Sequence, residues 1–338
     1  MKVNLVAVQA RPRLEDYVSA EAFHNKVSSL MQRVASSVDL GRPSLVAFPE
    51  AIGLYLSFVP FYYDRIKDCK TITQVMLRVI PRNLGPLLRT AWKHKVIGLR
   101  VPFIHTALEA EEIYWDVFSS LAREYGVYLL AGSLYTPPIE HEPMKGRFIL
   151  KPRVQNTSYL FSPRGVCLRR IPKVNLVPPL EDRVGFSGGA KSELVPIDTP
   201  LGRIGILVCF DGFHRTLIEH YDALACDIVA KPSYNTHPWN APWPGNPEIS
   251  EGEAWLRYGL SSLIQGRENV RFGVNPMMVG KIFDLEAEGR SIISRNTGRT
   301  DAPREETIVA IAEKPDEEEV VAATVEVAEE RQRKATPA

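Results

Sequence analysis

The stretches Val3-Asn4-Leu5-Val6-Ala7-Val8 and Leu45-Val46-Ala47-Phe48 frame the part of the sequence that decides the fold. Both are short and almost entirely apolar, which is typical of buried strands. Between them, apolar residues recur at helical spacing over residues 20–37. A strand, a helix and a second strand in this order predict parallel strand pairing and an α/β architecture.

The same alternation of strand and helix patterns continues through the rest of the chain. It predicts further strands at 127–132, 156–161, 166–170, 203–210, 227–231, 270–275, 291–294, 307–311 and 320–325, and helices at 111–125, 216–224 and 255–267. No change of composition and no low-complexity linker interrupts this alternation. We therefore predict a single domain over residues 1–330, followed by a tail at 331–338.

Charge and hydropathy argue against several classes of partner. The 338 residues include 41 Lys+Arg and 40 Asp+Glu, so the formal net charge is +1, whereas a nucleic-acid partner held through phosphates requires a basic surplus. The longest uncharged apolar stretch, near 52–63, is too short to span a bilayer, and the N-terminal apolar run ends too early for a signal peptide. We expect a cytoplasmic protein with no nucleic-acid or membrane partner.

The cysteines and histidines show neither metal-binding nor disulfide spacing. Cys69, Cys167, Cys209 and Cys226 form no CxxC pair, and the seven histidines form no HExxH motif. Neither a GxxxxGK[ST] motif nor a GxGxxG motif after a strand is present. We expect reduced thiols, no metal and no cofactor.

Three charged or nucleophilic residues follow three predicted strands. Cys209 ends the most apolar strand, just before Asp211 and a helix, where a turn can aim backbone N–H groups at the thiol, lower its pKa and provide oxyanion donors. Taken alone, a cysteine on a buried strand is more often inert, Lys173 is a solvated charge, and Glu50 is a first-turn acid of a helix. Together they lie at the carboxyl edge of a sheet, where α/β proteins build their sites.

The order of three motifs resembles the nitrilase superfamily of carbon-nitrogen hydrolases. These motifs are Ala47-Phe48-Pro49-Glu50-Ala51, Arg169-Arg170-Ile171-Pro172-Lys173 and Gly205-Ile206-Leu207-Val208-Cys209-Phe210-Asp211. Further landmarks that agree with the family pattern are Gln9, Asn156-Thr157, Gln265-Gly266-Arg267-Glu268-Asn269, Asn275 and Glu319-Val320-Val321-Ala322. The resemblance extends over nearly the whole chain.

The resemblance implies a four-layer α-β-β-α sandwich and a Glu-Lys-Cys triad. In that pattern, Cys209 is the nucleophile, Glu50 is the general base and Lys173 is the cation that stabilises the oxyanion. Glu181, eight residues after Lys173, resembles a second, positioning glutamate of the family amidases. The backbone N–H of Phe210 is the expected second oxyanion donor.

Two departures from the family pattern bear on the substrate. The nucleophile is followed by Phe210-Asp211, whereas nitrilases resemble one another in having Trp-Glu there, so an amide is favoured over a nitrile. The segment 51–112 is longer than the family spacer and is interpreted as an insertion that either walls the substrate pocket or forms an oligomer contact. The alternatives are a nitrilase, an N-carbamoyl amino acid amidohydrolase or an inactive scaffold with the same fold.

Four residues are candidates for binding the substrate: Tyr55, His214, Tyr234 and Trp239. Tyr55 lies in the apolar start of the insertion, Trp239 in a proline-rich loop and His214 at the start of a helix. The structural alternatives are an oligomer contact for Tyr55, packing for Trp239 and an ordinary first-turn position for His214. The family resemblance also implies a small-molecule amide or nitrile substrate and a homodimer or larger homo-oligomer.

Overall fold

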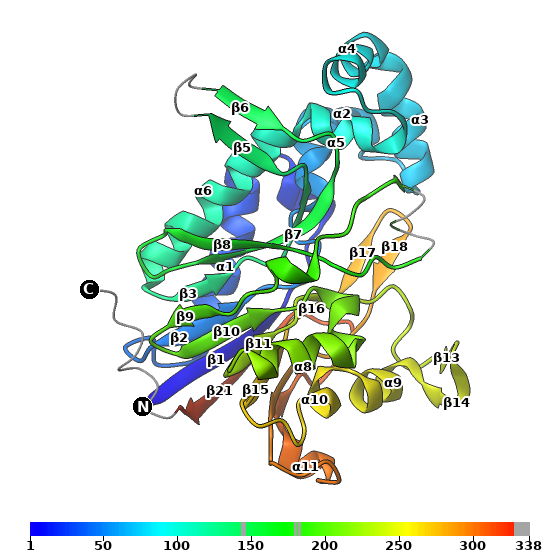
Figure 1. The fold of residues 1–338 in the computed structure, drawn as a ribbon. Coiled ribbons are helices and arrows are strands. Elements are labelled where there is room, and N and C mark those ends of the chain that lie inside the picture. Colours follow the sequence, from blue (N-terminus) through cyan, green and yellow to red (C-terminus); the bar gives the residue numbers. More distant parts are fainter. Residues whose placement is uncertain (143–146, 179–180, 182–183, 328–338) are drawn as a thin grey trace.

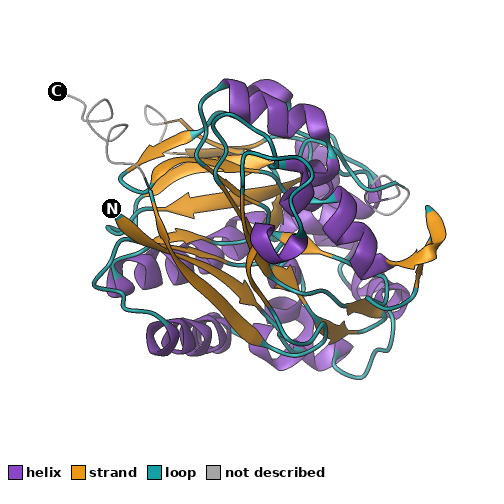
Figure 2. Cartoon of the chain, turned by 90° about the horizontal axis from the view of Figure 1, so that it is seen from below, coloured by secondary structure: helices purple, strands orange, loops and turns teal. Residues whose placement is uncertain are grey.

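The computed structural model describes residues 1–142, 147–178, 181 and 184–327. Two β-sheets form the centre of the molecule, and helices cover their outer faces (Figures 1 and 2). The predicted four-layer α-β-β-α sandwich is therefore confirmed.

The first sheet contains the opening strands of the chain in the order β21-β1-β2-β3-β7-β4, with β8 paired to β7. Its strands are β1 (Lys2–Gln9), β2 (Ser44–Ala47), β3 (Tyr128–Leu130), β4 (Leu134–Thr136), β7 (Gln155–Phe161), β8 (Cys167–Pro172) and β21 (Glu319–Glu326). β1 and β2 pair in parallel with Val6 opposite Val46, as the strand-helix-strand pattern predicts. β21 pairs antiparallel along all of β1.

The second sheet has the strand order β20-β19-β15-β11-β10-β9. Its strands are β9 (Ile197–Thr199), β10 (Gly202–Ile206), β11 (Ile228–Ala230), β15 (Phe272–Asn275), β19 (Ile292–Arg295) and β20 (Ile308–Ile311). β10, β11 and β15 run parallel, so their carboxyl ends share one edge of the sheet.

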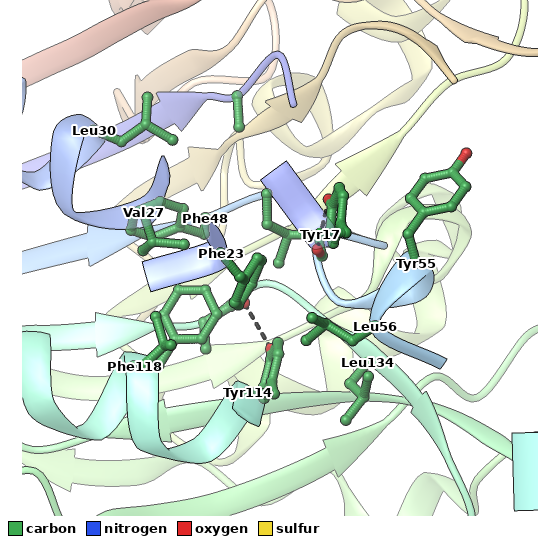
Figure 3. Close-up of a cluster of buried hydrophobic side chains, with 14 of the residues drawn as sticks. Tyr17, Phe23, Val27, Leu30, Phe48, Tyr55, Leu56, Tyr114, Phe118 and Leu134 are labelled. Carbon is green, nitrogen blue, oxygen red and sulfur yellow. Dashed lines mark hydrogen bonds between the residues drawn. The ribbon is translucent and has the colours of Figure 1, made fainter. Parts of the chain in front are cut away.

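Strand β1 shows why the opening stretch of sequence is apolar without interruption. Val6 and Val8 point into the core beneath the first helical layer, whereas Val3, Leu5 and Ala7 point into the core that the second sheet shares. Successive side chains of a strand face opposite sides, so a strand with both faces buried is apolar at nearly every position. Figure 3 shows the first of these cores, which contains Phe23, Val27, Leu30, Phe48 and Phe118.

Helices α1 and α6 cover the first sheet, and α8 to α10 cover the second (Figure 1). The helices are α1 (Ala20–Ser37), α2 (Val59–Ile66), α3 (Ile72–Arg82), α4 (Leu84–His94), α5 (Val101–His105), α6 (Ala107–Tyr125), α8 (Arg215–Ala223), α9 (Glu251–Tyr258), α10 (Leu260–Leu263) and α11 (Arg304–Thr307). α1 begins where the Ser19 hydroxyl accepts a hydrogen bond from the N–H of Ala22, and α6 ends at Gly126, whose φ is +63°. No helix in the described part of the chain combines the length and apolar character needed to cross a bilayer.

Short elements complete the described chain. They are the 3₁₀ turns η1 (Leu14–Tyr17), η2 (Leu54–Ser57), η3 (Gly98–Arg100), η5 (Lys191–Glu193) and η6 (Cys209–Phe213), and the strands β5 (Ile139–Glu142), β6 (Arg147–Leu150), β12 (Ser233–Tyr234), β13 (Pro242–Trp243), β14 (Asn246–Ser250), β16 (Met277–Met278), β17 (Gly280–Ile282) and β18 (Leu285–Ala287). The segment 51–112 contains α2 to α5, and α3 and α4 project from the sandwich (Figure 1).

Two predicted elements differ in the structure. The helix predicted over 255–267 is divided at Gly259 into α9 and α10, and a Cβ atom at Gly259 would lie 2.3 Å from the carbonyl oxygen of Trp255. The strand predicted over 203–210 ends at Ile206, because the chain enters the turn that carries Cys209.

Candidate active site

The ends of strands from both sheets bring the four predicted catalytic and supporting side chains together. Glu50 lies three residues after β2, Lys173 directly follows β8, and Cys209 lies three residues after β10. All three are buried, with exposed fractions of 2%, 2% and 5%. Glu181 comes from the loop after β8 and is also buried.

Lys173 links the two carboxylates of this cluster. Its Nζ lies 3.0 Å from Oε1 of Glu50 and 2.8 Å from Oε2 of Glu181. Burial alone lowers the pKa of the Lys173 ammonium, but Glu50, Cys209 and Glu181 outweigh it, so the pKa lies above its usual value. Lys173 is therefore a fixed cation held between two anions.

Asn156 and Tyr135 fix the orientation of the two carboxylates. The Asn156 side-chain N–H donates to Oε1 of Glu50 at 2.7 Å and to the Tyr135 hydroxyl oxygen at 3.0 Å. The Tyr135 hydroxyl donates to Oε1 of Glu181 at 3.3 Å. The sequence landmark Asn156-Thr157 marked the first of these residues, but no signal pointed to Tyr135.

The backbone at Cys209 adopts a conformation that L-amino acids rarely occupy. Its φ is +47°, and its N–H donates to the carbonyl oxygen of Pro232 at 2.8 Å. Ala51, directly after Glu50, also has a positive φ of +63°. Such residues cost free energy and persist where the surroundings determine them, commonly at functional sites. Here they aim the residues that follow β2 and β10 into the same cluster.

The Cys209 thiol faces two oxygen acceptors. Its Sγ lies 3.7 Å from the carbonyl oxygen of Tyr234, and the thiol is also within hydrogen-bonding reach of the Glu50 carboxylate. Burial, followed by the Glu50 charge, raises the pKa of Cys209 to about 12, although Lys173 and Lys231 oppose this shift. The turn was expected to lower this pKa. That expectation is wrong, because the desolvation of the buried thiolate exceeds the effect of the cations.

The pKa of Glu50 follows the same balance as that of Cys209, and for a proton acceptor this balance is favourable. Burial raises the pKa of its carboxyl group, Lys173 lowers it and Glu181 raises it, with a net increase. A raised carboxyl pKa makes Glu50 a better proton acceptor than a solvated glutamate. The arrangement can therefore move a proton from Cys209 to Glu50 beside a permanent cation.

Asp211 holds the Cys209 turn against the loop that carries Lys173. Its carboxylate accepts hydrogen bonds from the backbone N–H groups of Val174 at 2.9 Å and Asn175 at 2.7 Å. The Asn175 side chain adds a third bond at 2.9 Å. In the sequence, Asp211 belongs to the family motif and to the expected preference for amides, but no local pattern indicates this structural role, because its partners are more than 30 residues away in the chain.

Lys231 is a second buried lysine next to this cluster, and no sequence pattern pointed to it. Its Nζ lies 3.8 Å from the ring centroid of Phe213 and 4.1 Å from that of Trp255. Within the described chain Nζ has no hydrogen-bond partner. Burial lowers the pKa of Lys231 to about 7, although Cys209 and Glu50 oppose this shift. A Cβ atom at Gly212 would lie 2.5 Å from the Lys231 stem, so any other residue at this position would displace Lys231.

The four candidate substrate-binding residues differ in how they lie relative to Cys209 and Glu50. Trp239 packs in a buried cluster with Cys209 and Trp255. The hydroxyls of Tyr55 and Tyr234 hydrogen bond with each other, and burial, together with the Glu50 charge, raises the pKa of Tyr234. His214 packs on the Phe210 ring at 4.9 Å, and no contact between His214 and the Cys209 thiol is present in the described residues.

The expected second oxyanion donor, the N–H of Phe210, lies next to Cys209 in the chain. Phe210 is the second residue of η6, so its N–H belongs to the first turn, where backbone N–H groups have no partner within the helix. In the part of the chain that the structure describes, no group of three or more His, Cys, Asp or Glu side chains could hold a metal ion.

Comparisons with known proteins confirm the family resemblance. A family model described as carbon-nitrogen hydrolase matches residues 5–246. A carbon-nitrogen hydrolase from Helicobacter pylori G27 has a similar structure, with a TM-score of 0.63 and 16% identity, covering 99% of this chain and 92% of that chain. Nit3 from Saccharomyces cerevisiae, a member of branch 10 of the nitrilase superfamily, has a TM-score of 0.57 and 18% identity, covering 96% and 89%.

Two further relatives differ in activity. A mutant of an amidase from Nesterenkonia sp. AN1, in which acrylamide has added to the active-site cysteine, has a TM-score of 0.56 and 14% identity, covering 99% of this chain and 96% of that chain. At these identities the structural similarities show the shared fold. The apolipoprotein N-acyltransferase of Geobacter metallireducens is 31% identical over 127 residues, which is 33% of this chain and 22% of that protein. This chain thus matches less than a quarter of the length of that relative.

Proposed function

Because this chain belongs to the carbon-nitrogen hydrolase family, we propose that it is an amidase that releases ammonia through a thioester on Cys209. The observation that carries the proposal is the buried Lys173 ammonium bridging Glu50 and Glu181, with the Cys209 thiol in reach of Glu50. A nucleophile, a proton acceptor and a fixed cation are the groups that acyl transfer from an amide requires.

The acylation step begins with proton transfer from the Cys209 thiol to the Glu50 carboxylate. The thiolate attacks the amide carbon, and the carbonyl electron pair becomes an oxyanion stabilised by Lys173 and the Phe210 N–H. When the oxyanion re-forms the carbonyl, the C–N bond breaks and Glu50 donates its proton to the leaving nitrogen. The products are ammonia and an acyl-thioester on Cys209.

In the deacylation step, water is the nucleophile, and Glu50 again accepts a proton and later returns it. Glu50 accepts a proton from water, and the hydroxide attacks the thioester carbon. Collapse of the second oxyanion breaks the C–S bond, and the thiolate recovers its proton from Glu50. The carboxylic acid leaves, and Glu50 and Cys209 return to their starting protonation states.

Glu181 and the aromatic residues have positioning roles in this proposal. Glu181 keeps Lys173 charged and in place through the 2.8 Å ion pair. Trp239 packs beside Cys209 and is proposed to contact the acyl group, together with Tyr55 and Tyr234. The small-molecule substrate, the cytoplasmic location, the single domain over 1–330, the insertion over 51–112 and the homo-oligomeric state remain predictions. The tail at 331–338 lies outside the described residues.

The amidase whose active-site cysteine adds acrylamide supports an amide over a nitrile or a carbamoyl amino acid. The N-acyltransferase relative supports a second candidate, in which an amine rather than water accepts the acyl group. Both candidates share the thioester on Cys209 and differ only in the second nucleophile.

A product assay tests the proposal. We expect ammonia release from aliphatic or aromatic amides, with less from nitriles or carbamoyl amino acids, and none with Cys209→Ala. Peptide mass measurement on wild-type protein quenched with acid during turnover should detect an acyl adduct on the peptide that contains Cys209. Equal turnover by Cys209→Ala would overturn the proposal. Hydroxamate formation that exceeds acid formation with added hydroxylamine would favour the acyltransferase.

A further inference from the structure

The positive charge of this nearly neutral chain is concentrated in one segment. Residues 69–108 contain seven Lys+Arg and no Asp or Glu, so the rest of the chain has 34 basic against 40 acidic residues. These cations lie on α3, on α4 and in the segments that flank them, the part of the molecule that projects from the sandwich (Figure 1). We call residues 70–100 the basic hairpin.

The basic hairpin also exposes large apolar side chains. Leu84, Leu88 and Trp92 recur every four residues along α4, and their exposed fractions are 51%, 59% and 86%. This spacing places them on one face of the helix. Leu77 and Ile97 are also exposed, at 68% and 79%, and a cavity of about 230 Å³ lies between α4 and the chain that follows it.

The opposite face of α4 packs against the rest of the protein. Leu87 is buried in a cluster with Val96 and Val101, and this cluster continues to Tyr135, the residue that hydrogen bonds with Glu181. The exposed stripe is therefore a second apolar face, and contiguous exposed apolar surface of this kind marks a docking site.

The charges around the stripe decide which occupant fits. Among the described residues, Arg82, Arg89, Lys93 and Lys95 have no acidic partner, whereas Arg78 pairs with Asp68. A second copy docked through the same face would bring these cations against each other, which is unfavourable. A nucleic acid would neutralise the cations but would leave Leu84, Leu88 and Trp92 in water.

We propose that the basic hairpin docks on the surface of an anionic lipid bilayer, with Leu84, Leu88 and Trp92 in the headgroup region and the cations against the lipid phosphates. Basic residues beside exposed Leu and Trp are the signature of helices that lie in this interface. α4 has 11 residues and a length of about 16 Å, so it lies on the bilayer, whose apolar core is about 30 Å thick. This surface contact revises the expectation of no membrane partner.

Vesicle binding tests the proposal on the full chain. We expect co-sedimentation with vesicles of equal parts phosphatidylglycerol and phosphatidylcholine, and little with phosphatidylcholine alone. Binding should weaken as salt rises from about 0.1 M to about 1 M, because the attraction is screened. The triple variant Arg82→Gln, Arg89→Gln and Lys93→Gln should lower the partition coefficient at least about tenfold.

Matched variants test whether vesicle binding depends on the basic hairpin or on charged and apolar residues anywhere on the surface. Leu84→Ser, Leu88→Ser and Trp92→Ser together should also lower partitioning at least about tenfold. Two controls remove equivalent groups elsewhere. One control variant combines Arg123→Gln, Lys191→Gln and Arg271→Gln. The other control variant combines Val166→Ser, Leu168→Ser and Tyr258→Ser. Both controls should retain binding, and all four variants should retain hydrolysis of a soluble amide.

Three results would overturn the proposal. One is equal binding to neutral and anionic vesicles, and another is binding that the hairpin variants leave unchanged. The third is self-association of the free protein that the Leu84, Leu88 and Trp92 variant abolishes, since a second copy would then cover the stripe. Loss of amide hydrolysis with normal vesicle binding would count against the proposed function instead.

Discussion

Two buried lysines act on Cys209 from opposite kinds of surroundings. Lys173 lies between the carboxylates of Glu50 and Glu181, whereas Lys231 lies between the rings of Phe213 and Trp255 and has no carboxylate partner in the described chain. The pKa of Lys173 is above its usual value, and burial lowers the pKa of Lys231 to about 7. Burial is similar in the two cases, so the partners account for the difference.

The difference indicates separate tasks for the two cations. The pKa of Lys173 lies above its usual value, so Lys173 is charged at neutral pH and is suited to stabilise an oxyanion. Lys231 changes its charge near neutral pH, so its effect on the thiol depends on pH. Four predictions test this comparison.

The largest effect is expected from removing the group on which both lysines act. Cys209→Ala should lower amide turnover by at least about 10⁴-fold, because the other groups cannot form the thioester. Cys226→Ala removes another fully buried thiol and should retain turnover. Ammonia release under saturating substrate measures both, and comparable losses in the two variants would contradict the role of Cys209.

Lys173→Met should lower turnover by about 10²–10³-fold, through the loss of one oxyanion donor. It should also lower the free energy of unfolding by about 3–5 kcal/mol at neutral pH, because two buried carboxylates lose their cation. Lys173 lowers the pKa of Glu50, so this pKa should rise in the variant and the lost stability should return in part as the pH falls. Urea unfolding at several pH values checks this, and a pH-independent loss would contradict the ion-pair explanation.

Asp211→Asn should lower turnover by about 10²-fold, because the Cys209 turn loses its attachment to the Lys173 loop and small displacements of reacting groups are costly. Stability should fall by about 1–3 kcal/mol. Asp222→Asn is the matched control, since Asp222 also accepts three hydrogen bonds, in its case all from the backbone N–H groups of residues 268–270. The control should lose stability alone, and an equal loss of turnover would argue against a positioning role for Asp211.

Lys231→Met should have the smallest effect on turnover, about tenfold, equivalent to one pKa unit of the thiol. Whereas turnover should fall, the free energy of unfolding near pH 6 should be higher in this variant than in the wild type. The folded state lowers the Lys231 pKa from 10.5 to about 7, so the unfolded chain binds more protons between these values and wild-type stability rises with pH there. The variant should be more stable than the wild type near pH 6, and this advantage should shrink toward pH 10. A constant difference across that range would show that Lys231 does not titrate as proposed.

The sequence determined much of the framework of this protein. The apolar runs around β1 and β2 predicted a buried parallel pair, because a strand covered on both faces needs apolar residues at successive positions. Strand ends also marked Glu50, Lys173 and Cys209, since the carboxyl edge of a sheet collects the residues that follow its strands. These are local patterns, and a single sequence contains them directly.

Only the tertiary structure decided how these residues behave. Contacts among residues far apart in the sequence bury Cys209 and raise its pKa to about 12, against the expectation from its turn. The same packing places Lys231 beside aromatic rings from two other segments, and it uses one apolar face of α4 while leaving the other exposed. Periodicity shows which residues share a face, whereas desolvation and pairing depend on what the folded chain places against that face.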